Sequence, residues 1–156
     1  MGFWSGIKYA LNSTLGTSDF ESLDKIIKGQ KSLVASDNLY CVVSTEYIYT
    51  AKGVNKEKTL FKLKADGSFK FSFSAYIDTS YDASIYLVKN GIQTTSSPLV
   101  KVDDTSGYAT YFSGIVSANK NDIIGIMLQP RSGNRLFINE ISIYADIIDN
   151  SALEIL

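Results

Sequence analysis

Residues 67–76 alternate strictly between apolar and polar side chains. A period of two places successive side chains on opposite faces of a strand, so one face lies on a core and the other in water. This pattern predicts a half-buried strand at the centre of a β-sandwich. The apolar side chains should line the interior and the polar ones the opposite face. The apolar positions are Phe69, Phe71, Phe73 and Ala75, and the polar ones Lys70, Ser72 and Ser74.

A turn signal stands directly before this strand. Asp66 and Gly67 separate it from a second alternating run over residues 60–65. Asp-Gly favours a type I′ turn, because both central residues of that turn need a positive φ. The sequence therefore predicts a β-hairpin over residues 59–77.

The remainder of the chain up to residue 148 continues in the same manner. Short apolar or alternating segments are separated by turn clusters, and Asn90-Gly91 is a second type I′ signal. Pro98 indicates an edge strand or an irregular loop. About eight strands at this spacing, with no helical segment among them, predict an all-β, antiparallel sandwich over residues 36–156.

The N-terminal 35 residues have a different period. Apolar side chains recur at helical spacing on either side of Gly16-Thr17, and Ser18 with Glu21 forms a capping box. Two short amphipathic helices are expected, and each is too short to be stable alone. Their apolar face should pack either on the β domain or, as we favour, on a partner or sister copies. The predicted docking residues are Trp4, Ile7, Leu11, Leu15, Phe20, Leu23 and Ile27.

Composition excludes several functions. The net charge of −1 argues against a nucleic-acid surface, and the longest apolar runs are too short for a membrane span. The N-terminus does not have the pattern of a signal peptide, so synthesis in a cytoplasm is expected. The chain has no histidine, and its one cysteine, Cys41, is expected to be a small buried side chain in a strand. We therefore expect neither an enzyme nor a cofactor.

Acidic residues gather in predicted turns, where aspartate caps its own backbone. We interpret them as turn formers, with a calcium site at Asp103-Asp104 as the alternative. They are Asp78, Asp82, Asp103, Asp104 and Asp122.

Glycan binding suits the predicted loops better than catalysis does, because they combine aromatic rings with amide and guanidinium donors. The alternative is that the tyrosines pack on the sandwich or at a subunit interface, and that the arginines are solvated. The candidate residues are Tyr81, Tyr108, Tyr111, Arg131, Asn134 and Arg135.

Residues 3–17, Phe-Trp-Ser-Gly-Ile-Lys-Tyr-Ala-Leu-Asn-Ser-Thr-Leu-Gly-Thr, resemble the opening of small proteins encoded among the tail genes of phages and prophages of Gram-positive bacteria. The likeness covers roughly the first 27 residues. It implies an N-terminal module that attaches a variable C-terminal domain to the particle.

A second resemblance covers residues 59–147. Segments 67–73, 85–91, 113–126 and 137–144 are similar to strands and turns of the complement-head and tumour-necrosis-factor-like jelly rolls, with Asn121 where those heads have glycine. This resemblance implies a jelly-roll head that forms a homotrimer, with Phe69, Phe71 and Phe73 lying in the interior or in part at the three-fold contact. The chain has no Gly-X-Y stem, so the helical arm would have to replace it.

Two functions follow from these expectations. The first is a virion structural protein of a phage or prophage, such as a tail-fibre, baseplate or decoration component, whose head contributes to adhesion to the host surface. Its partners would be its own copies, other virion proteins and a host glycan. The second is a free-standing, lectin-like carbohydrate-binding module.

Overall fold

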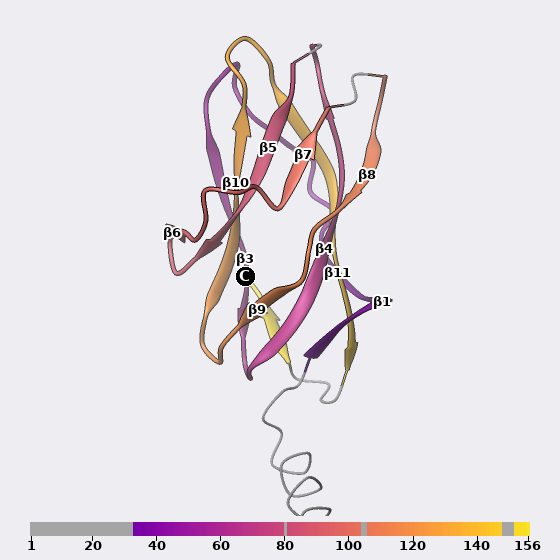
Figure 1. The fold of residues 1–156 in the computed structure, drawn as a ribbon, viewed down its shortest axis with the longest axis vertical. Helices are drawn as coiled ribbons and strands as arrows, with labels where there is room; N and C mark the ends of the chain where they lie inside the picture. The colour runs from indigo at the N-terminus through magenta and orange to yellow at the C-terminus, as the bar shows by residue number, and fades with distance from the viewer. Residues whose placement is uncertain (1–32, 80, 104–105, 148–151) are drawn as a thin grey trace, which may run out of the picture.

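The computed structural model describes residues 33–79, 81–103, 106–147 and 152–156, so the two predicted helices of the N-terminal arm lie outside it. In these residues the strands form two sheets, each six-stranded, that pack face to face (Figure 1). The prediction of an all-β sandwich is confirmed. About eight strands were expected, whereas the described residues contain twelve, several of them only two to four residues long.

Sheet A contains the central strand of the sequence pattern. Its members are β1 (Leu33–Ser44), β2 (Ile48–Tyr49), β4 (Gly67–Ile77), β8 (Ala109–Phe112), β9 (Val116–Ala118) and β11 (Leu136–Ile147). Sheet B consists of β3 (Lys56–Leu63), β5 (Ala83–Lys89), β6 (Ile92–Gln93), β7 (Val100–Val102), β10 (Ile123–Pro130) and β12 (Leu153–Ile155). In sheet A, β4 and β11 pair along most of their length, and β8 and β9 pair with the other edge of β4.

The core lies between the sheets and is rich in aromatic rings. Phe69, Phe71 and Phe73 of β4 are all completely buried, as the alternation predicts. The Phe69 and Phe71 rings meet edge to face at 5.2 Å, and Phe61 of sheet B meets Phe69 in the same way at 5.5 Å. This edge-to-face geometry is the one that aromatic quadrupoles favour.

The predicted hairpin over residues 59–77 is wrong, because β3 and β4 belong to different sheets. Gly67 is not among the glycines with a positive φ, so Asp66-Gly67 does not form a type I′ turn. Gly67 is needed for a different reason. A Cβ atom at this position would lie 2.9 Å from the Cβ of Leu33, with which Gly67 pairs. The glycine therefore permits a close approach of two strands rather than a reversal of the chain.

The second turn signal is confirmed, since Asn90 has a φ of 52° and Gly91 a φ of 78° between β5 and β6. The segment containing Pro98 forms β6 and β7, which pair with β5 at the edge of sheet B, as expected. Asp122 is a turn former, because its carboxylate accepts a hydrogen bond from the backbone N–H of Asn119. That bond lowers the pKa of Asp122.

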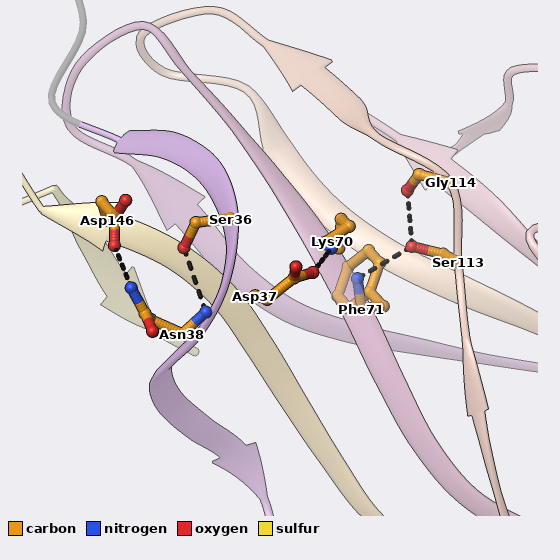
Figure 2. Close-up of polar contacts among 8 residues, drawn as sticks. All are labelled: Ser36, Asp37, Asn38, Lys70, Phe71, Ser113, Gly114 and Asp146. Carbon is orange, nitrogen blue, oxygen red and sulfur yellow. Dashed lines mark hydrogen bonds and ion pairs between the residues drawn. The ribbon is translucent and has the colours of Figure 1, made fainter.

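Sheet A has an unusual crossing near its edge. The start of β1 lies between β4 and β11, because Leu33 pairs with Gly67 and with Ile147. Residues 39–44 of β1 instead pair with β11 along the edge opposite to β4. Residues 36–38, where the register shifts, therefore cross β11; Figure 2 shows this strand curving in front of it. We call residues 36–38 the crossover segment.

Candidate functional site

The outer face of sheet A, which points away from the core, carries a row of aromatic rings. Phe137 pairs with Tyr76 on one side and with Tyr49 on the other. Cross-strand neighbours on one face lie within ring contact. The Tyr76 and Phe137 rings are accordingly almost parallel, with centroids 4.5 Å apart, and Tyr49 stacks on Phe137 at 6.3 Å. Tyr108 meets Tyr76 edge to face at 4.6 Å.

Tyr47 lies against this row and is itself half exposed. Its ring is 5.9 Å from Tyr49 and 6.2 Å from Phe137. Burial and hydrogen bonding to Tyr47 raise the pKa of Tyr76 and of Tyr108 above the ordinary tyrosine value. We call Tyr47, Tyr49, Tyr76, Tyr108 and Phe137 the tyrosine cluster. Within it, Tyr47, Tyr49 and Tyr108 are the members whose rings are most exposed, at 51%, 54% and 41%.

A pocket lies toward the other end of the same face. It has a volume of about 320 Å³ and is lined by Asp37, Lys70, Phe112 and Tyr144. The rings of Phe112 and Tyr144 are nearly perpendicular, with centroids 5.5 Å apart, and Phe112 is 57% exposed. The ammonium group of Lys70 donates to the carboxylate of Asp37 (Figure 2). Rings, a donor and an acceptor therefore meet in one concave place, which we call the aromatic pocket.

The crossover segment positions the acidic side of this pocket. The side-chain amide of Asn38 donates to Asp146 of β11 at 2.7 Å, and its backbone N–H donates to the Ser36 hydroxyl at 3.1 Å. These bonds hold Asp37 over β11, facing Lys70 of β4 (Figure 2). The hydrogen bond from Lys70 and its positive charge lower the pKa of Asp37. Asp37 is therefore ionised at neutral pH and can accept hydrogen bonds from a ligand hydroxyl.

Four of the predicted glycan residues gather at one end of the sandwich, in the β4–β5 and β10–β11 loops. Arg131 lies over the Tyr81 ring at 5.7 Å and forms an ion pair with Asp82 at 3.1 Å. Asn134 is completely buried, and its amide donates to the backbone carbonyls of Tyr81 and Asp82. Arg135 is exposed. A shallow polar pocket of about 210 Å³ lies beside Arg131. In this loop cluster, Asn134 joins the loops rather than facing solvent.

The other two predicted residues separate from that group. Tyr108 belongs to the tyrosine cluster, whereas Tyr111 packs against the core. The residues that sequence reasoning missed as site candidates are Asp37, Lys70, Phe112 and Tyr144. A signal existed for Lys70, which was correctly expected on the outer face. No local pattern reveals that the other three lie beside it, because their pairing joins strands that are far apart in the sequence.

The described residues contain no group of three or more His, Cys, Asp or Glu side chains that could hold a metal ion. Asp104 of the alternative calcium site lies outside them. Cys41 is half buried in β1, and burial raises the pKa of its thiol. Within the same part of the chain, no helix has the length and apolarity needed to cross a membrane.

No protein-family model and no curated protein matches the chain. Among solved structures, a native family 35 carbohydrate binding module from Clostridium thermocellum matches with a TM-score of 0.50 at 11% identity, over 68% of this chain and 98% of the module. The C-terminal domain of EclA, described as a sugar-binding protein, has a TM-score of 0.43 at 18% identity, over 67% of this chain and 82% of that domain.

A ruminal GH26 endo-beta-1,4-mannanase has a TM-score of 0.44 at 15% identity, over 64% of this chain and 19% of the enzyme. At these identities the likeness to the family 35 module concerns the fold alone. The two lower TM-scores carry no further argument.

Proposed function

We propose that this chain is a carbohydrate-binding module and that its ligand binds to the outer face of sheet A. The observation that carries the proposal is the aromatic pocket, in which two nearly perpendicular rings adjoin the Lys70–Asp37 ion pair. The fold shared with the family 35 carbohydrate binding module supports it. The binding is non-covalent, and we propose no catalytic step.

The chemistry of the pocket suits a sugar ring. A sugar presents C–H groups, which carry slight positive charge, and hydroxyl groups that both donate and accept. The negative faces of Phe112 and Tyr144 attract the C–H groups. Lys70 supplies donors and Asp37 supplies acceptors for the hydroxyls, and a few such polar groups fix the orientation of a bound ligand.

The sequence also suggested a jelly-roll head, a homotrimer and attachment to a virion through residues 1–35. These remain proposals that rest on the two sequence resemblances, and the helical arm lies outside the described residues. They are compatible with glycan binding, because several copies on one particle would add weak sites through avidity.

A glycan array followed by isothermal titration calorimetry tests the proposal. We expect the wild-type protein to bind at least one glycan, and the Phe112→Ala variant to bind it about five- to tenfold more weakly, as expected for loss of an aromatic anchor. Ile92→Ala is the matched control, because Ile92 is a 70% exposed apolar side chain on sheet B. The proposal fails if wild-type protein binds no glycan, or if the two variants bind equally well.

A further inference from the structure

We infer that the aromatic pocket and the tyrosine cluster are the two ends of one site, and that this site takes a linear, uncharged oligosaccharide rather than a single sugar. The inference rests on the proposed function and names its ligand class. It follows from the spacing of the two aromatic groups, the side chains between them and the charge of the face.

The spacing follows from the strand register. Lys70 of the pocket pairs with Tyr144, and Tyr76 of the tyrosine cluster pairs with Phe137, so β4 and β11 carry both groups on the same face. Tyr76 lies six positions after Lys70, and a strand rises by roughly 3.3 Å per residue, so these two residues are about 20 Å apart. This distance exceeds one sugar ring and matches a chain of several.

The surface between the two groups is polar and built of small side chains. On β4, Ser74 is partly exposed and pairs with the exposed Glu140 of β11, whereas Ser72 and its partner Ser142 are buried, at 8% and 2% exposure. Thr110 of β8 lies opposite Ser74 on the other side. The accessible hydroxyls of Ser74 and Thr110 can both donate to and accept from the hydroxyls of an extended chain.

Exposed rings are available at both ends, as an extended ligand requires. Tyr47 and Tyr108 are 51% and 41% exposed at one end, and Phe112 is 57% exposed at the other. Interface energy concentrates in such aromatic anchors. Two anchors joined by a hydroxyl-lined strip suit a polymer in which C–H faces and hydroxyls recur along the chain.

The charge of the face selects an uncharged chain. Lys70 is the cation of the pocket, and Asp37 already neutralises it. At the tyrosine cluster, the Lys56 ammonium lies 5.7 Å from the centre of the Tyr49 ring. Glu140 is exposed on β11 between the two groups, and Asp146 lies beside the crossover segment. An anionic polymer would therefore meet an excess of carboxylates, which repel it.

Calorimetry with oligosaccharides of increasing length tests the inference. The probes are β-1,4-linked gluco-, manno- and xylo-oligosaccharides from the monosaccharide upward, with oligogalacturonate as the anionic comparison. For at least one neutral series, affinity should rise with length and level off once the chain spans both groups. Tyr47→Ala should weaken the longest oligomer about five- to tenfold and leave the shortest bound oligomer unchanged. Phe112→Ala should weaken both.

Several results would overturn the inference. Equal affinity for short and long oligomers would leave glycan binding intact and refute only the extended site, as would a preference for oligogalacturonate. Binding of no oligomer, where the glycan array has found a ligand, would refute only the extended site; both proposals fall if the array finds no ligand either. Light scattering adds one further outcome: a wild-type dimer that Tyr47→Ala converts to a monomer would assign this face to a second copy of the chain.

Two controls accompany these measurements. Thermal unfolding of Tyr47→Ala and Phe112→Ala establishes that both variants are folded. The Tyr47→Phe variant, which keeps the ring, should retain binding to the longest oligomer.

Discussion

Ser113 stands where β8 ends and fastens this end of the strand to β4, next to the aromatic pocket. Its backbone N–H donates to the carbonyl of Phe71 at 3.0 Å, and its hydroxyl oxygen accepts from the Phe71 N–H at 2.8 Å. The hydroxyl itself donates to the carbonyl of Gly114 at 2.7 Å (Figure 2). The Ser113→Ala substitution removes the acceptor of a buried backbone donor, because Phe71 is completely buried.

The expected cost follows from that single loss. A buried N–H left without its partner costs about 1–3 kcal/mol, whereas the carbonyl of exposed Gly114 can bond to water instead. For a chain of this length, each 1 kcal/mol lowers the melting temperature by about 2–4 °C, so a fall of roughly 2–12 °C is expected.

Urea unfolding followed by circular dichroism measures the loss in free energy of unfolding directly. The midpoint for Ser113→Ala should fall with no change in slope. Ser117→Ala is the control, since Ser117 is exposed on β9 and a surface substitution usually stays within about 0.5 kcal/mol of wild type. If Ser113→Ala proves as stable as Ser117→Ala, the Ser113 hydroxyl does not hold the end of β8 as described.

Two further predictions concern the sheet and the tyrosine cluster. Gly125→Ala on β10 should destabilise the fold by about 1–3 kcal/mol in thermal unfolding, because the new Cβ atom would lie 2.7 Å from the backbone oxygen of Lys58; unchanged stability would show that β3 and β10 can separate freely. Tyr47→Phe should lower the pKa of Tyr108 toward the ordinary value of about 10 in an ultraviolet pH titration, because it removes the hydrogen bond that favours the neutral phenol. Since folding raises this pKa, its contribution to stability is complete below about pH 10 and is lost as the pH rises further. A titration curve identical to that of the wild type would contradict the assigned contact.

The fold class could be predicted because it depends on local periodicity. Alternation in residues 67–76 correctly placed the phenylalanines inside and Lys70 outside. The hairpin before it could not be predicted correctly, since Asp66-Gly67 has the composition of a turn while Gly67 serves close packing on Leu33. Nothing within a short window distinguishes a glycine that needs a positive φ from one that needs space.

The candidate site was predictable only in part. Tyrosines on the surface were expected to bind sugar, and Tyr108 does belong to the tyrosine cluster. The aromatic pocket joins β1, β4, β8 and β11, and Asp37 reaches it only because the crossover segment passes over β11. Such non-local pairing depends on the register of four strands, which single-residue patterns do not encode.

The central claim is that carbohydrate binds to the outer face of sheet A. The most direct test is a nuclear magnetic resonance titration of the labelled protein with the tightest-binding oligosaccharide. The account predicts chemical-shift changes at the backbone amides of Lys70, Phe112 and Tyr144, continuing toward Tyr76. Changes confined to the loop cluster around Tyr81 and Arg131, or changes on sheet B alone, would contradict it.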